Sequence, residues 1–134
     1  MHMLHHLSFA VTDIERSAKF YDKALGELGY VRVFEDLRPG EDGQAVGYGL
    51  AGEEDKFCIK LASASSATTG HGFHLAFAAP NRESVHNFHK AALLHGGIDN
   101  GAPGARPDYG PNYCACFVVD PDGHKLEAVI NSAA

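Results

Sequence analysis

Apolar residues along the chain follow two patterns, one typical of strands and one typical of helices. Residues 4–11 and 72–78 are rich in β-compatible apolar residues, and each run stops at a polar or proline turn, which predicts two strands. After each run the apolar residues recur every three or four positions, which predicts helices that begin after Asp13 and after Asn81. Both residues favour helix N-caps, and Gly96-Gly97 is a typical end for the second helix.

The same order of elements occurs twice. The segment HLSFA at residues 6–10 returns as HLAFA at residues 74–78, an offset of 68 residues. At that offset residues 6–29 and 74–97 share nine identities in 24 positions. Chance would give roughly one or two, so two copies of one supersecondary unit explain the pattern. Short apolar runs predict three more strands per copy, at about 30–35, 45–50 and 56–62, and at about 98–102, 114–119 and 124–130.

This repeat predicts an α+β fold of two βαβββ modules related by an internal pseudo-twofold axis. We expect a single domain over residues 1–134, with module 1 at about 1–63 and module 2 at about 70–134. The small polar residues from Ser63 to Gly70 are expected to link the modules. Pro121-Asp122-Gly123 predicts a tight turn between the last two strands.

Composition and charge narrow the class of protein. Of the 134 residues, 45% are hydrophobic and 21% charged, as in soluble globular domains that bury a core without disulfides or a structural metal. Eleven Lys and Arg against seventeen Asp and Glu give a formal net charge of −6, the wrong sign for nucleic-acid binding. No apolar run approaches the roughly 20 residues that span a bilayer, and the first residues lack the features of a secretory signal.

The three cysteines, Cys58, Cys114 and Cys116, cannot all pair, and their spacing matches no zinc-finger pattern. Cys114 and Cys116 would point to one face of a strand, where buried thiols are ordinary core residues; a redox pair is the alternative interpretation. Unpaired cysteines indicate a reducing compartment, and we therefore expect a cytoplasmic protein.

The repeat also places a histidine at the same point of each half, His6 and His74. A pseudo-twofold axis could aim both imidazoles into one cleft, where two imidazoles and one carboxylate would form a facial triad for a divalent metal. The last predicted strand offers Glu127, which has apolar residues on both sides and needs a cation or a donor if it is buried. The alternative is that all three are ordinary half-buried or solvated side chains.

We expect the other histidines to play no role in such a site. His5 would point to the opposite side of its strand from His6. The remaining ones are predicted to be surface or turn residues: His2, His71, His86, His89, His95 and His124.

At three places the residues resemble a known family. The opening HLSFAVTD at residues 6–13, with Phe20-Tyr21 and Leu25-Gly26 after it, resembles the start of vicinal oxygen chelate proteins. GFHLAF at 72–77 resembles the start of their second module, and FVVDPDGHKLE at 117–127 is similar to their closing signature. This superfamily includes glyoxalase I, extradiol dioxygenases, fosfomycin-resistance enzymes and bleomycin-resistance proteins, and the resemblance covers nearly the whole chain.

The resemblance implies paired βαβββ modules around a divalent metal ion, with His6, His74 and Glu127 as ligands, and a homodimer. The metal could be Fe, Mn, Zn, Ni or Co, because such a ligand set accepts all of them. Glyoxalase I has a fourth ligand, a Glu on the last strand of the first module. The strict repeat offset puts Ile59 at that position and a one-residue slip puts Lys60 there, so glyoxalase I activity is doubtful.

The leading hypothesis is a small metal-dependent enzyme that acts on a small molecule chelating through neighbouring oxygens, of lyase, isomerase or dioxygenase type. Tyr113 is a candidate proton donor, with a packed aromatic as the alternative. The glycine- and proline-rich segments 38–43 and 101–112 are expected to form long mobile loops. They carry Arg38, Arg106 and Tyr109, which could contact an anionic substrate.

Two other functions remain open. One is a metal-free module that binds a drug or metabolite, although the presence of all three ligand types argues against it. The other is a thiol transferase of the fosfomycin-resistance kind, which would share the triad. Neither a nucleic-acid partner nor a membrane is expected.

Overall fold

The computed structural model describes residues 3–63 and 72–133, and its elements follow the predicted order twice. Each half contains one helix and four strands. In chain order they are β1 (Leu7–Val11), α1 (Ile14–Gly26), β2 (Val31–Asp36), β3 (Ala45–Gly49), β4 (Phe57–Leu61), β5 (Leu75–Ala78), α2 (Arg82–Leu94), β6 (Ile98–Ala105), β7 (Tyr113–Val119) and β8 (Lys125–Asn131).

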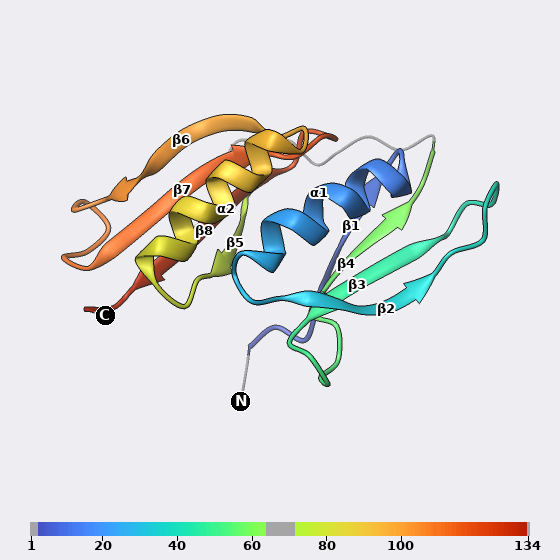
Figure 1. Ribbon diagram of the computed structural model, residues 1–134, viewed down its shortest axis with the longest axis horizontal. Helices are drawn as coiled ribbons and strands as arrows, with labels where there is room; N and C mark the ends of the chain where they lie inside the picture. Colours follow the sequence, from blue (N-terminus) through green and yellow to red (C-terminus); the bar gives the residue numbers. More distant parts are fainter. Residues whose placement is uncertain (1–2, 64–71, 134) are drawn as a thin grey trace.

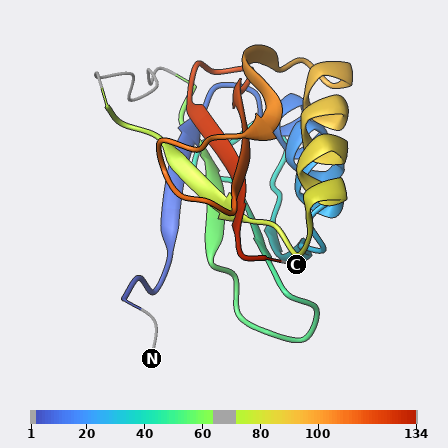
Figure 2. The same ribbon diagram turned by 90° about the vertical axis from the view of Figure 1, so that its left-hand side faces the viewer.

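The strands form two four-stranded sheets that confirm the predicted fold class. Sheet A has the order β1-β4-β3-β2 and sheet B the order β5-β8-β7-β6. β1 runs parallel to β4, and β5 runs parallel to β8. The other neighbouring strands are antiparallel. The helices α1 and α2 lie side by side and cover one face of the sheets (Figures 1 and 2). In the described part of the chain the opposite, open face carries no helix.

Both helices begin at the predicted caps. The Asp13 carboxylate accepts from the Arg16 N–H at 3.0 Å, and the Asn81 side-chain oxygen accepts from the Ser84 N–H at 2.8 Å. These bonds satisfy backbone donors that have no partner inside the helix. Gly96 follows the end of α2 with φ of +101°, a left-handed conformation that favours glycine.

The core fills the space between the helices and the sheets. Its largest fully buried apolar side chains include Tyr21, Phe20, Phe88, Leu25, Ile59 and Leu126. Cys114 and Cys116 belong to it, as predicted for two residues on one strand face. Neither helix is long and apolar enough to cross a membrane, in the residues that the structure describes.

Two predictions about element boundaries were wrong. The first strand begins at Leu7 rather than at residue 4, so His5 and His6 precede it. Strand β6 continues to Ala105, into the segment predicted as a loop, because its backbone still pairs with β7 through two register shifts around Gly101. The predicted linker after Ser63 lies outside the described residues.

Candidate functional site

The open face of sheet B carries a buried carboxylate, Glu127. Along β8 the residues alternate, so Leu126, Ala128 and Ile130 face the core below α2 while Glu127 faces the other way. Its side chain is nevertheless only 3% exposed. A buried carboxylate is costly unless hydrogen-bond donors surround it, and its neighbours on this face supply them.

Two side chains donate to this carboxylate. The Nε2 atom of His74, just before β5, lies 2.9 Å from Glu127 Oε1, and the Tyr113 hydroxyl at the start of β7 donates to Oε2. Burial, together with the hydrogen bond and the charge of Glu127, raises the pKa of Tyr113 to about 12. Tyr113 therefore keeps its proton at neutral pH. The His74 side chain is 45% exposed, so this cluster is open to solvent on one side.

Aromatic side chains lie beside this cluster. The Phe117 ring lies 6.4 Å from the His74 ring, and the Tyr109 ring packs edge-on against Tyr113 at 5.2 Å. The Arg106 guanidinium lies over Phe117, 5.5 Å from the ring centre. Three sequence candidates, Tyr113, Arg106 and Tyr109, thus gather on the same face as His74 and Glu127.

His6 lies apart from the pair. Its Nδ1 atom lies 2.9 Å from that of His5, and His5 reaches Glu54 at 3.5 Å. The two rings do not point to opposite sides as expected, because strand alternation begins only at Leu7. Both histidines line a cavity of about 400 Å³ that lies between the start of β1, the β3–β4 connection and β5. Neither His74 nor Glu127 lines this cavity.

Arg38 is also apart from the pair. It follows β2 in sheet A, where it pairs with Asp36 at 3.0 Å and with Glu41 at 2.9 Å. Within the described residues no group of three His, Cys, Asp or Glu side chains is placed to hold a metal ion. Two of the three predicted ligands therefore meet in one chain, and the third does not join them there.

The register of the sheets identifies the counterpart of Glu127 in module 1. Ala76 pairs with Glu127 in sheet B, and Ser8, 68 residues before Ala76, pairs with Cys58 in sheet A. The expectation that Ile59 or Lys60 would occupy this position was wrong. The offset between β4 and β8 is 69 residues rather than 68, since one extra residue lies between β5 and β8. Cys58 is 4% exposed, and burial and the nearby Asp55 raise its pKa.

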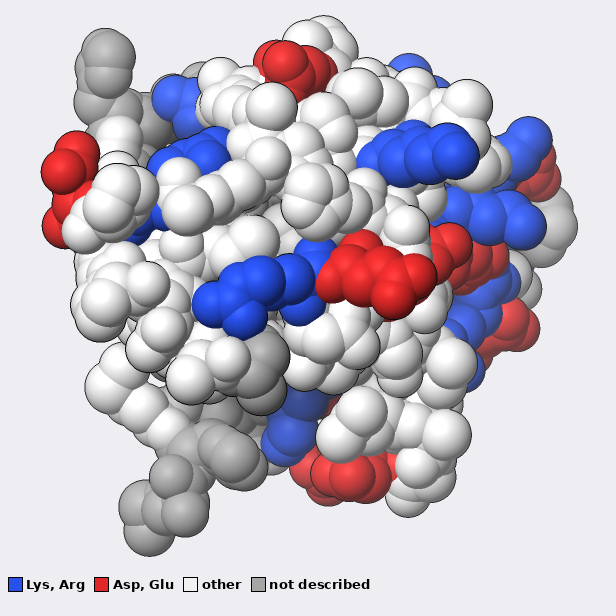
Figure 3. Space-filling model, turned by 60° about the vertical axis from the view of Figure 1, so that its left-hand side comes forward, with Lys and Arg blue, Asp and Glu red and all other residues white. Residues whose placement is uncertain are grey.

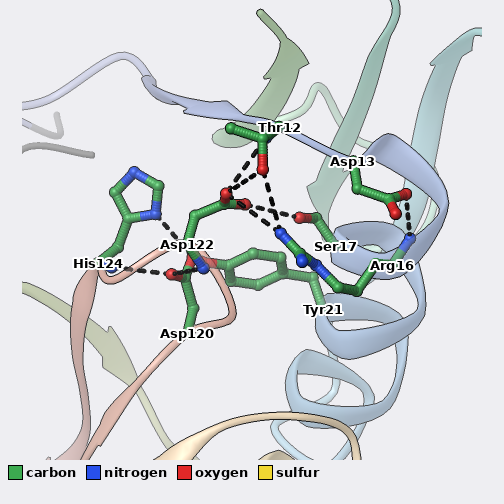
Figure 4. Close-up of polar contacts among 8 residues, drawn as sticks. All are labelled: Thr12, Asp13, Arg16, Ser17, Tyr21, Asp120, Asp122 and His124. Carbon is green, nitrogen blue, oxygen red and sulfur yellow. Dashed lines mark hydrogen bonds and ion pairs between the residues drawn. The ribbon is translucent and has the colours of Figure 1, made fainter. Parts of the chain in front are cut away.

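A second polar cluster joins the two modules and was not predicted (Figure 4). The Asp120 carboxylate accepts from the Tyr21 hydroxyl at 2.5 Å and from His124 Nδ1 at 2.7 Å. Asp122 accepts from the Thr12 hydroxyl at 2.6 Å and pairs with Arg16 at 3.2 Å. The turn between β7 and β8 therefore binds the start of α1.

His124 was predicted to be a surface or turn residue; it lies in the turn between β7 and β8, but it is buried rather than at the surface. It is 2% exposed and its ring stacks on Phe9 with 4.1 Å between centres. His86, His89 and His95 lie on α2 or at its end, where His89 pairs with Asp99 at 2.9 Å. His2 and His71 lie outside the described residues.

One face of the molecule is of mixed charge. Figure 3 shows basic and acidic groups that touch one another in several places, with uncharged surface around them and no continuous basic area.

Comparison with known proteins gives one family. The model of the Glyoxalase/Bleomycin resistance protein/Dioxygenase superfamily matches residues 3–128. No curated protein matches the chain. Among solved structures, a glyoxalase/bleomycin resistance protein from Albidiferax ferrireducens T118 is 31% identical with a TM-score of 0.76, over 96% of this chain and 98% of that one.

More distant structures share the fold. Glyoxalase I from Zea mays is 26% identical with a TM-score of 0.71, over 95% of this chain but only 45% of the maize protein. A glyoxylase/bleomycin resistance protein/dioxygenase domain from Frankia sp. EAN1pec is 16% identical with a TM-score of 0.72, over 98% of this chain and 99% of that one.

Proposed function

The chain belongs to the Glyoxalase/Bleomycin resistance protein/Dioxygenase superfamily, and from this premise we propose that it is a small metal-dependent enzyme. Its substrate is a small molecule that chelates through neighbouring oxygen atoms, and the reaction is of lyase, isomerase or dioxygenase type. The observation that carries this proposal is the Glu127 carboxylate, buried on the open face of sheet B with His74 and Tyr113 on its two oxygens.

The donor set fits a divalent cation. An imidazole nitrogen just before β5 and a carboxylate oxygen on the neighbouring β8 lie 2.9 Å apart and would serve as two adjacent ligands of a two-histidine, one-carboxylate site. His6 would complete it. When bound there, a divalent ion such as Fe, Mn, Zn, Ni or Co would polarise two neighbouring substrate oxygens as a Lewis acid.

The protein's own residues supply the rest of the chemistry. Tyr113 Oη carries a proton at neutral pH and donates its single O–H to Glu127. If a cation held the carboxylate instead, this O–H would be released and could donate to a substrate oxygen on that face. The Phe117 and Tyr109 rings lie beside His74 and Tyr113 and give one side of the cluster an apolar border.

We further propose that the site is completed in a homodimer. Among the described strands, β1 and β5 are edge strands, each hydrogen-bonded to a neighbouring strand on one side only. Phe73, just before β5, is 37% exposed, and the cavity beside His6 is lined by both β1 and β5. A second copy laid along these edges could bring its His6 to His74 and Glu127. The three described cysteines are unpaired, which supports a cytoplasmic location.

Metal analysis of protein purified without a histidine tag and without added metal tests the proposal. We expect a tightly bound divalent metal in the parent protein, and a large loss of affinity in Glu127→Gln, His74→Ala and His6→Ala. Glu83→Gln, an equal charge change in the first turn of α2, is the matched control and should bind as the parent does. Equal binding in all variants would overturn the metal centre and favour a metal-free binding module.

A further inference from the structure

The guanidinium of Arg106 is held by the main chain of β6, the strand that precedes it. Its Nη2 donates to the carbonyl of Ala102 at 2.6 Å, and Nη1 donates to that of Gly104 at 3.1 Å. The guanidinium also lies over the Phe117 ring. A Cβ at Gly101 would come within 2.9 Å of Phe117 Cδ2, and the φ of Gly101 is +152°. Only glycine leaves room there for the ring that supports Arg106.

The charge of this guanidinium is not neutralised by the protein. All of its hydrogen bonds go to main-chain carbonyls, and in residues 3–63 and 72–133 it forms no ion pair and its Nε–H finds no acceptor. Arg32 and Arg38 differ, since Arg32 pairs with Asp22 and Glu35, and Arg38 with two carboxylates. A half-buried guanidinium that main-chain hydrogen bonds hold in place, with an open N–H, is suited to bind a planar anion.

Arg106 faces the same space as the proposed metal ligands. Its backbone N–H donates to the carbonyl of Tyr113, so the two residues lie opposite each other across β6 and β7. Phe117, which it covers, pairs with Glu127 in the register of β7 and β8. The cation, the hydroxyl and the carboxylate therefore border one region of the open face.

We propose that Arg106 is an anion subsite, and that the substrate carries a carboxylate besides its chelating oxygens. This inference rests on the proposed function, because the anion is placed relative to the metal ligands. A carboxylate bound by Arg106 would lie near the Phe117 ring, which also neighbours His74, so the remainder of a small substrate could extend over Phe117 toward His74 and Glu127. Arg106 then selects among chelating molecules by charge.

Two hydroxamates that differ in one carboxylate test this selection. Calorimetric titration of the Zn²⁺-loaded protein compares acetohydroxamate, a neutral chelator, with the monohydroxamate of succinic acid. We expect the anionic probe to bind at least about tenfold more tightly than the neutral one. In Arg106→Gln this advantage is lost while acetohydroxamate binds as before, and Arg106→Lys keeps part of it.

Lys90→Gln is the matched control, because it removes one positive charge from the exposed surface of α2, on the other side of sheet B. It should leave both affinities unchanged. Equal affinities of the two probes in the parent protein, or an advantage that survives Arg106→Gln, would overturn the subsite. In both cases metal-dependent binding of acetohydroxamate would leave the metal centre standing.

A titration of metal-free protein with benzoate and benzamide separates the two proposals further. If acetohydroxamate fails to bind but benzoate binds in an Arg106-dependent manner and benzamide does not, the subsite stands and the metal centre falls. If the metal-loaded protein binds neither hydroxamate and the metal-free protein does not bind benzoate, both proposals fall.

Discussion

The contact between Tyr113 and Glu127 gives a titration that can be measured. Glu127→Gln removes the charge that raises the Tyr113 pKa but leaves burial in place, so we expect that pKa to fall from about 12 part of the way toward 10. Tyrosinate absorbance followed against pH measures it. Subtracting the curve of Tyr113→Phe in each background isolates this residue. An unchanged midpoint would show that the carboxylate does not act on Tyr113.

The same shift makes stability depend on pH in a defined direction. The folded-state pKa of Tyr113 lies above the unfolded value of 10.0, so folding favours the neutral phenol. Its contribution is fully present below about pH 10 and is lost as the pH rises toward about 12. Urea unfolding at several alkaline pH values should therefore show a shallower loss of stability in Tyr113→Phe than in the parent. Parallel curves would contradict this.

Much of this cluster was predictable from the residues around Glu127. Its position between apolar neighbours predicted a carboxylate inside the fold, and the 3% exposure of its side chain agrees with that. His74 was predicted beside it from the repeat, and the two are 2.9 Å apart. His124 was predicted as a surface or turn residue, and its burial was missed because it depends on Phe9, which comes from β1 in the other module. Local pattern identifies a buried carboxylate, but not which distant groups cover a turn.

At the scale of elements, the repeat predicted nearly everything that depends on local sequence. The helices α1 and α2 are both 13 residues long and lie one repeat offset apart. The offset fails at the last strand, where the extra residue before β8 moves Cys58 into the place assigned to Ile59 or Lys60. A one-residue change of register exchanges the two faces of a strand, and no local signal records where it occurs.

The caps of these helices provide a test of local stability. Asn81 accepts from the Ser84 backbone and from its hydroxyl, both at 2.8 Å. Asn81→Ala should lower the free energy of unfolding by about 1 kcal/mol, since it leaves helix N–H groups without a partner. Asn81→Ser retains an acceptor and should cost much less. Urea denaturation measures both, and equal losses in the two variants would show that the cap contributes little.

For the whole molecule, the orientation of the modules depends on contacts that sequence reasoning missed. Tyr21 and Asp120 are 99 positions apart, and Thr12 and Asp122 are 110 apart (Figure 4). Hydrophobic pattern does not report such pairs, because each member looks like an ordinary helix or turn residue. The orientation of the two modules nevertheless determines which parts of sheets A and B a second chain could contact.

Removal of a single oxygen atom, the Tyr21 hydroxyl, should weaken this inter-module cluster. Tyr21 is fully buried, and Tyr21→Phe removes one donor from the buried Asp120 carboxylate. We expect the free energy of unfolding to fall by about 1–3 kcal/mol. Tyr109→Phe is the control: Tyr109 is 64% exposed, and the change should stay within about 0.5 kcal/mol. If the two variants lose equal stability in urea, the cluster does not hold the modules together.

The proposed dimer makes a prediction that concerns both sites at once. His6 and the pair of His74 and Glu127 lie apart in one chain, so a composite site must take them from different chains. His6→Ala and His74→Ala proteins would then each lack a ligand in every site. In a mixed dimer, however, one site receives His6 from the His74→Ala chain, and His74 with Glu127 from the His6→Ala chain. That site is complete, and the other lacks both histidines.

Mixing the two proteins under conditions that allow exchange of chains therefore tests the arrangement. Random pairing makes about half of the dimers mixed, so we expect tight metal binding to return at roughly one ion for every four chains. Each variant alone should bind none tightly, and sedimentation equilibrium should report dimers throughout. A site formed within one chain cannot be restored by mixing. Its signature would be no recovery in the mixture, together with a monomeric parent that still binds one ion per chain.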